Sequence, residues 1–229
     1  MADVDQDSYI DVVLTMSFYN NTSSQTLTLT GLLVNVEANT TLSDGNTRAL
    51  VPVPDTSLYY SLPKLAGKNT MFATFLDIAQ NGRLDIILQK YDESGVPQLQ
   101  FLYNNIINDY FYMKSYFLNS GTVNVGQPYG NAAIGPSYRF VATSYMSDTK
   151  FVLTGSQAYQ SSYLSCQLPY YYQGIGKTNN YIETFYATTS MGGTRAEQMW
   201  TPIIPNSQLI VFAGSSSESD WGIELFISP

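Results

Sequence analysis

The sequence contains no histidine and a single cysteine, and these two shortages exclude much of enzyme chemistry. Histidine is the commonest general base and transition-metal ligand, so its absence removes Ser-His and Cys-His nucleophile arrangements. Cys166 cannot form a disulfide within the chain. Because no basic residue stands beside it to favour the thiolate, we interpret it as a small buried side chain. We therefore expect a protein that is not an enzyme.

Basic residues are also scarce, with 10 Lys plus Arg against 18 Asp plus Glu and a formal net charge of −8. This balance argues against a phosphate-binding surface, so we expect neither nucleic acid nor an anionic membrane as a partner. No run of about 18 apolar residues is present, and we expect no membrane-spanning helix in this chain. Met1 and Ala2 lead directly into an acidic segment, so no signal or transit peptide is expected before it.

The chain does contain enough apolar material for a packed globular protein. Its 229 residues are 44% hydrophobic and 14% aromatic, which fits one large all-β domain or two smaller ones. Short alternating runs bounded by turn residues predict strands over 11–18, 26–30, 32–37, 98–105, 110–118, 138–143, 150–154 and 223–227, and a pair of strands around a polar loop over 71–88. Gly31 is expected to open a separate strand, Pro52 to keep its segment out of the middle of a sheet, and residues 194–199 to form a helical turn or two.

The most informative stretch is an acidic loop at residues 3–11, which runs into the apolar segment that begins at Val12. Clustered carboxylates repel one another, and oxygen-rich loops hold Ca²⁺ to offset such repulsion. The predicted Ca²⁺ ligands are the carboxylates of Asp3, Asp5, Asp7 and Asp11 and the backbone carbonyl of Tyr9. An EF-hand fits poorly, because Ser8 and Leu14 stand where its loop needs Gly and Glu. The alternative is a solvated acidic turn before a strand.

A weaker copy of this loop follows 74 positions later, between Asp77 and Asp85. It retains Asp77, Asn81 and Asp85 as candidate side-chain ligands and Arg83 as a backbone ligand, but Ala79 occupies the third place. This loop either holds Ca²⁺ weakly or is braced by hydrogen bonds from the backbone to its Asp side chains. Repetition of an acidic loop followed by strands is typical of a propeller-like array.

The opening loop resembles the Ca²⁺ loop of FG-GAP repeats, the blades of integrin α-subunit propellers, in which D-x-[DN]-x-D-G-x-x-D precedes an apolar strand. Ser8 replaces the usual Gly, which is expected to strain the turn without removing a ligand. The segments 167–170, 174–176, 181–183 and 200–211 are similar to the end of the T-cell immunomodulatory protein family, also called linkin. That family consists of type I membrane proteins with an extracellular FG-GAP propeller and a following β-sandwich.

The resemblance implies an all-β chain with partial FG-GAP β-propeller blades at 1–107 and a C-terminal β-sandwich at 108–229. It implies a fragment or a shortened member of the family, because the earlier blades and the transmembrane helix are absent. Open blades expose strand edges, so we expect a protein partner, either the missing blades or another chain.

The function expected from these observations is a non-enzymatic, Ca²⁺-stabilised adhesion or assembly protein, extracellular or on the cell surface. N-glycosylation sequons at Asn20, Asn21 and Asn39 agree with a secretory route. The alternative is a structural subunit of a large intracellular or organellar complex, which the absence of targeting segments favours. A hydrolase that uses the carboxylates with a metal-bound water is a third possibility, disfavoured because no base stands nearby in the sequence.

Overall fold

The computed structural model describes residues 1–22, 24–38, 47–53, 70–118, 132–158, 160, 168–178, 181–191, 194–213 and 221–227. These residues form strands and no helix, so the all-β prediction is confirmed. None of them belongs to a helix long and apolar enough to cross a membrane. The chain divides into two compact units, Met1–Asp5 with Tyr9–Asn108, and Gln6–Ser8 with Asp109–Pro229. Asn39 and Cys166 lie outside the described residues.

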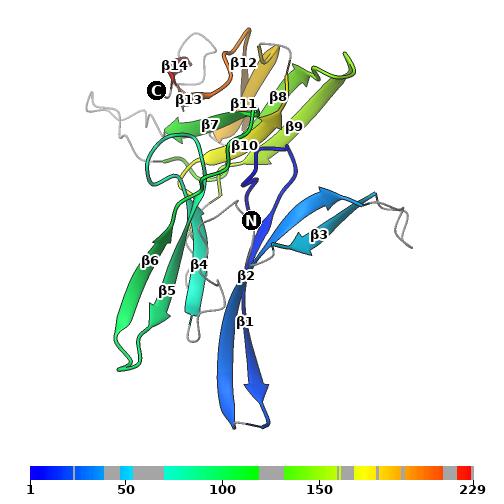
Figure 1. Cartoon of the computed structure of the whole chain (residues 1–229). Coiled ribbons are helices and arrows are strands. Elements are labelled where there is room, and N and C mark those ends of the chain that lie inside the picture. Colours follow the sequence, from blue (N-terminus) through cyan, green and yellow to red (C-terminus); the bar gives the residue numbers. More distant parts are fainter. Residues whose placement is uncertain are drawn as a thin grey trace, which may run out of the picture. The chain divides into compact units, whose positions relative to one another are not determined.

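The first unit contains two three-stranded antiparallel sheets with the strand orders β1-β2-β3 and β4-β5-β6 (Figure 1). The strands are β1 Val12–Asn20, β2 Gln25–Glu37, β3 Arg48–Pro52, β4 Thr70–Leu76, β5 Asp85–Tyr91 and β6 Pro97–Leu102. β4 lies against β1 and β2. Leu32, Leu84 and Ile86 are buried in this unit. β3 is an edge strand, which suits Pro52 because proline has no N–H to donate to a further strand.

The expected break at Gly31 is wrong, because β2 runs through it without interruption. Gly31 pairs with Leu14 of β1, and the antiparallel register continues from Val12↔Leu33 to Asn20↔Gln25. A glycine weakens a strand through its conformational entropy, but it still supplies both backbone hydrogen-bonding groups to the ladder. The long partner strand therefore determines the conformation at Gly31.

The second unit contains two four-stranded sheets with the orders β10-β7-β13-β14 and β12-β11-β8-β9. The strands are β7 Phe111–Leu118, β8 Ser137–Thr143, β9 Lys150–Ser156, β10 Tyr171–Gly176, β11 Thr184–Met191, β12 Thr194–Trp200, β13 Ser207–Phe212 and β14 Gly222–Ile227. β13 and β7 pair in parallel, and the other pairings are antiparallel.

One hydrophobic core joins these two sheets of the second unit, with buried side chains from β7 and β13 of one sheet and β8 and β11 of the other. Aromatic rings dominate it: Phe140 stacks on Phe185 with centroids 4.9 Å apart, and Phe185 stacks on Trp200 at 5.6 Å. Stacked aromatic pairs add stabilisation beyond the area that they bury. The core thus determines which side chains of each strand face inward. The polar residues that alternate with them along the strands face outward.

The expected helical turn at 194–199 is also wrong, because these residues belong to β12. β12 pairs with β11 from Phe185↔Trp200 to Met191↔Thr194. Trp200 packs against the core at the end of this strand. Burial of a large aromatic side chain outweighs the small difference in intrinsic propensity that suggests a helix for Arg-Ala-Glu-Gln-Met.

Candidate metal centre

Three of the predicted ligands come together at the head of β1. Asp3, Asp5 and Asp11 each place a carboxylate oxygen within 4.8 Å of the others, and they form the group of three acidic residues found among the described residues. Asp3 and Asp11 are buried, at 1% and 0% exposed, and Asp5 is half-buried. Buried carboxylates need compensating partners, so this cluster is the strongest candidate site of the first unit.

Backbone hydrogen bonds hold the two ends of this loop together. The N–H of Ala2 donates to the carbonyl of Asp11 at 3.1 Å, and the N–H of Asp11 donates to the carbonyl of Ala2 at 2.9 Å. The Asp11 carboxylate accepts the N–H of Val4 on one oxygen and that of Asn35 on the other, both at 2.8 Å. Each carboxylate oxygen has a second lone pair, so Asp11 can shape the loop and still coordinate a cation.

Asp7 and Tyr9, the other two predicted ligands, do not belong to this group of three. Asp7 is half-buried in the segment Gln6–Ser8, which clusters with the second unit. Within that unit the segment is anchored on β10: the N–H of Gly176 donates to the Gln6 carbonyl at 2.9 Å. The Tyr9 ring is 45% exposed, and the Arg48 guanidinium lies 3.4 Å from its centroid.

The loop from Asp77 to Asp85 has the same backbone conformation as the loop from Asp3 to Asp11. Gln80 and Gly82 have positive φ angles of 53° and 77°, and Gln6 and Ser8, 74 positions earlier, have 66° and 79°. Leu76 pairs with Asp85 in the β4–β5 ladder, just as Ala2 bridges Asp11. The repeat predicted from the spacing of acidic residues is therefore also a repeat of backbone conformation.

Backbone donors occupy the Asp side chains of the second loop. Asp77 accepts the N–H groups of Asn81 at 3.0 Å and Gly82 at 3.1 Å, one on each oxygen. Asp85 accepts the N–H of Ile78 at 3.1 Å and that of Asn104 at 2.8 Å. Burial raises the pKa of Asp85 above its ordinary value, although these two donors act in the opposite direction.

The other candidate ligands of this loop are close to its surface. The Asn81 side-chain oxygen accepts the N–H of Arg83 at 3.0 Å, and Asn81 itself is exposed. The structure thus shows the bracing that the sequence offered as one alternative, and the metal alternative stays a prediction for this loop.

Sequence reasoning missed the two asparagines that complete these loops. Asn35 and Asn104 donate their N–H groups to Asp11 and Asp85, so they occupy equivalent places in the two repeats. The buried Asn104 side chain also donates to the carbonyls of Val4 at 3.0 Å and Leu84 at 3.2 Å, and so links the two loops. The only available signal was an asparagine near the end of a predicted strand.

The predicted glycosylation residues Asn20 and Asn21 lie where β1 turns into β2. Asn21 is exposed, and Asn20 is half-buried with its side-chain oxygen accepting the N–H of Thr22 at 2.9 Å. Asn21 is therefore the more accessible of the two acceptors.

These features define a class: an all-β protein with paired acidic loops at strand heads in one unit and two sheets around a shared core in the other. Residues 128–226 match the family described as ITFG1, C2 domain. The sequence comparisons extend this match over the whole chain, which belongs to the T-cell immunomodulatory protein family. The family predicted from the segments of its second half is confirmed, and the FG-GAP assignment stays a prediction.

Three relatives show the extent of the similarity. The T-cell immunomodulatory protein homolog of Plasmodium falciparum is 29% identical over 246 residues, covering 100% of this chain and 33% of the relative. The T-cell immunomodulatory protein of Homo sapiens is 28% identical, covering 100% of this chain and 37% of the relative. That of Rattus norvegicus is 32% identical, covering 71% and 28%. The chain thus spans about a third of the length of these relatives, and none of their names describes a catalysed reaction. No solved structure matches this chain.

Proposed function

We propose that this chain is a non-enzymatic, Ca²⁺-stabilised part of an extracellular or cell-surface adhesion or assembly protein. The observation that carries the proposal is the buried group of carboxylates from Asp3, Asp5 and Asp11. The names of the relatives, which describe immunomodulation, support a role that is not catalytic.

The donor set suits Ca²⁺ in chemistry and in size. Oxygen ligands bind Ca²⁺ at about 2.4 Å, so two oxygens on opposite sides of one ion lie about 4.8 Å apart. The oxygens of the three carboxylates lie within 4.8 Å of one another. Without a cation, each pair of charges at that separation repels by about 3 kcal/mol at an effective dielectric constant near 20. A bound Ca²⁺ removes this repulsion.

The ion acts as a structural staple in this proposal. Asp11 connects the loop to Val4 and Asn35 through its two hydrogen bonds, so a cation held by Asp11 also fixes the entry to β1 and the neighbouring strand β2. Binding to the folded state alone stabilises it by RT ln(1 + [Ca²⁺]/Kd), about 2.7 kcal/mol at a concentration 100-fold above Kd.

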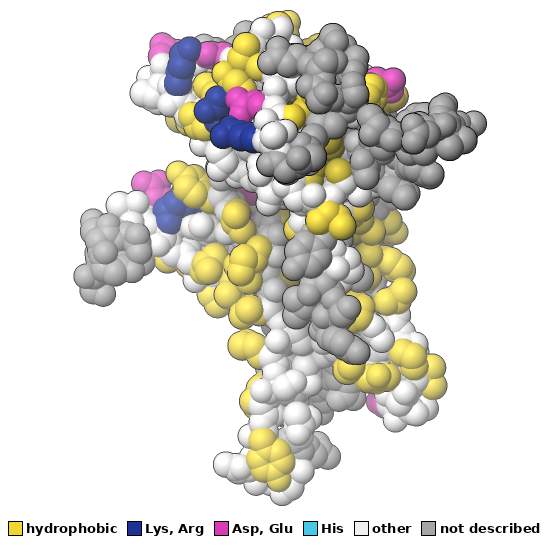
Figure 2. Space-filling view, turned by 180° about the vertical axis from the view of Figure 1, so that it is seen from behind, with side chains coloured by type: hydrophobic (Ala, Val, Ile, Leu, Met, Phe, Trp, Pro, Cys, Tyr) yellow, Lys and Arg dark blue, Asp and Glu magenta, His cyan; other side chains and the backbone are white. Residues whose placement is uncertain are grey.

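Exposed apolar side chains in the first unit support a protein partner. The edge strand β6 carries Leu99 and Phe101 on one face, at 60% and 47% exposed, and Tyr103 follows at 54%. Figure 2 shows several hydrophobic side chains, in yellow, on the surface in the lower half of the view. An edge strand with an apolar face invites pairing with another strand. The partner we propose is a further blade of the family's propeller, from the same or another chain.

The proposed extracellular or cell-surface location rests on the resemblance to the T-cell immunomodulatory protein family and on the N-glycosylation sequon at Asn21. Asn21 is exposed at the turn between β1 and β2, where a glycan would meet no packed side chain of the core. On these grounds we propose a location outside the cell, in preference to an organellar complex.

The test of the metal centre is titration of the metal-stripped chain with Ca²⁺ in a calorimeter, with thermal melts in Ca²⁺ and in chelator. We expect one high-affinity site, at the first loop, and a higher melting temperature in Ca²⁺. Asp5→Asn is the most informative variant. Asp5 is only half-buried, whereas Asp11 accepts two backbone N–H groups, so replacing Asp11 would also disturb the loop itself. Asp5→Asn should weaken binding by about tenfold or more, because affinity follows the number of charged ligands.

The matched control is Glu93→Gln, which removes one negative charge from the exposed turn between β5 and β6 of the same unit. It should bind Ca²⁺ as the parent chain does. Equal melting temperatures with and without Ca²⁺, or equal losses in both variants, would refute the structural metal site and leave only general screening of an acidic chain.

A further inference from the structure

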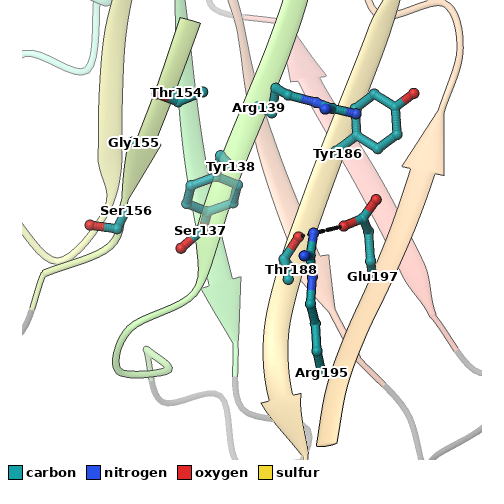
Figure 3. Close-up of a pocket in the computed structure, with 10 residues that line it drawn as sticks. All are labelled: Ser137, Tyr138, Arg139, Thr154, Gly155, Ser156, Tyr186, Thr188, Arg195 and Glu197. Atoms are coloured by element: carbon teal, nitrogen blue, oxygen red, sulfur yellow. Dashed lines mark hydrogen bonds and ion pairs between the residues drawn. The ribbon is translucent and has the colours of Figure 1, made fainter.

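The second unit has an open hollow, lined by both polar and apolar atoms, on the outer face of the sheet β12-β11-β8-β9. Its volume is about 410 Å³, a size that suits a monosaccharide-sized molecule. Its lining includes Ser137, Arg139, Tyr186, Thr188, Arg195 and Glu197, and Figure 3 shows these side chains on neighbouring strands. The hollow lies wholly within one unit and shares no residue with the acidic loops.

Strand register assembles this lining in two rows. Arg139 of β8 pairs with Thr154 of β9 and with Tyr186 of β11. In the second row, two residues further along each strand on the same face, Ser137 pairs with Ser156 and with Thr188. Because side chains alternate between the faces of a strand, these residues share the face opposite to the aromatic core.

The second row continues to the edge strand, where Thr188 pairs with Glu197 of β12. The ladder holds the backbones of these paired strands, so the floor of the hollow is set by the sheet and not by a loop.

The charges in the hollow leave one arginine for a ligand. Arg195 forms an ion pair with Glu197, and the Thr188 hydroxyl donates to the same carboxylate at 3.3 Å. Arg139 lies over the Tyr186 ring, with 3.9 Å between the guanidinium carbon and the ring centroid, and within the described residues it forms no ion pair. The hollow thus carries a formal charge of one positive unit in a chain of net charge −8. Figure 2 shows basic side chains gathered beside acidic ones in the upper part of the view.

This arrangement selects a particular ligand chemistry. A guanidinium presents a planar fork of donors that matches a carboxylate, and stacking on an aromatic ring fixes its plane in advance. The Ser and Thr hydroxyls can each donate and accept, as the hydroxyl groups of a sugar do. We propose that the hollow binds a sugar acid, a hydroxyl-rich ring with one carboxylate, with the carboxylate on Arg139 and the ring hydroxyls along the Ser and Thr rows. The sugar acid is either free or the end of a glycan.

The test is a titration of the full chain with glucuronate, followed by the amide signals of β8 and β11 in two-dimensional NMR spectra. Glucose and acetate are the comparison probes, because each carries one half of the proposed chemistry. We expect glucuronate to shift these signals at concentrations about tenfold or more below either comparison probe, since glucose lacks the charge-assisted hydrogen bond to the guanidinium and acetate lacks the hydrogen bonds of the ring hydroxyls. Glucuronate and a glucuronate-terminated oligosaccharide distinguish the free from the glycan-borne ligand.

Two variants in the hollow should act in opposite directions. Arg139→Gln removes the cation for which the described residues offer no carboxylate, and it should weaken glucuronate binding by about tenfold or more. Glu197→Gln removes the competing carboxylate and should strengthen binding, without touching the core. Lys150→Gln is the matched control: Lys150 is an exposed cation of the same sheet that pairs with Glu183 outside the hollow, and its loss should leave glucuronate binding unchanged.

Each contrary result overturns the proposal. Equal shifts with acetate would mean that the hollow takes any small anion, and equal shifts with glucose would mean that the charge is not used. Binding that survives Arg139→Gln, or that falls in Glu197→Gln, would place the ligand elsewhere. Absence of shifts at high millimolar glucuronate would exclude the site altogether. Misfolding of the Arg139 variant alone would also abolish binding. The predicted gain of affinity in Glu197→Gln cannot arise from misfolding, so it tests the proposal independently.

Discussion

Replacement of Ser8 by glycine should stabilise the chain, because Ser8 is held in a backbone conformation that favours glycine. Its φ angle is 79°, in the left-handed region, and the equivalent residue of the second loop is Gly82 at 77°. A residue with a Cβ atom loses about 1–2 kcal/mol in this region. Glycine also makes the unfolded chain more flexible, which lowers the free energy of unfolding by about 0.4–1 kcal/mol. We therefore expect Ser8→Gly to raise the free energy of unfolding by about 0.5–1 kcal/mol.

Urea denaturation followed by tryptophan fluorescence is the suitable assay. Both tryptophans, Trp200 and Trp221, lie in the second unit, and the segment Gln6–Ser8 clusters with that unit. The fluorescence midpoint therefore reports the unit that holds Ser8, even if the two units unfold separately. A shift in the midpoint at constant slope is the expected result.

Ser8→Ala separates the backbone from the hydroxyl. Alanine keeps the Cβ atom and its strain, so it should be no more stable than serine, and the order of stability should be Gly above Ser and Ser at or above Ala. The Ser8 hydroxyl approaches Gly176, where a built Cβ would lie 3.3 Å from its oxygen. If Ser8→Gly and Ser8→Ala were destabilised equally, the hydroxyl would outweigh the strain and the reasoning from φ would be refuted.

Two further changes test the second unit. A Cβ atom built on Gly155 lies 2.0 Å from the ring of Tyr171. Because overpacking displaces core side chains, Gly155→Ala should destabilise the second unit by about 1–3 kcal/mol in the same urea assay. An unchanged midpoint would show that the ring moves freely. The hydrogen bond from Lys150 holds the pKa of Glu183 below its ordinary value, so this pair stabilises the fold above that value and the contribution is lost as the pH falls through the lowered pKa. The effect should be small and salt-sensitive because both groups are solvent-accessible. Lys150→Gln should reduce this part of the pH profile and leave the part that comes from the Thr143 hydroxyl, which also donates to Glu183. Coinciding profiles of the parent and the variant would contradict this prediction.

The sequence reveals local features of the metal centre and misses those that depend on strand pairing. Asp3, Asp5 and Asp11 stand within nine positions, so their spacing alone suggests that one loop gathers them. Asn35 is brought to Asp11 by the β1–β2 hairpin, and Asn104 reaches Asp85 through the β5–β6 hairpin. No pattern near the acidic residues indicates these contacts, because a register of many pairs determines them.

The same distinction explains the errors over Gly31 and residues 194–199. In both places a local preference, a glycine break or a helix-forming composition, competes with a strand partner that is distant in the sequence. Gly31 has Leu14 opposite it, and residues 194–200 have β11 along their whole length. The hollow was missed for the same reason, since Arg139 and Tyr186 become neighbours only through the register of β8 and β11.

Comparison of the two acidic loops separates the shape of the loop from its charge. Both loops have positive φ angles at their fourth and sixth places and a ninth-place Asp that accepts two backbone N–H groups. They differ at the third place, where Asp5 of the first loop corresponds to Ala79 of the second. The shared hydrogen bonds are thus enough to form the turn, and the third-place carboxylate adds charge to a turn that already exists. A cation at the first loop would therefore bind to a largely preformed site, so most of its binding free energy would appear as stability of the folded unit.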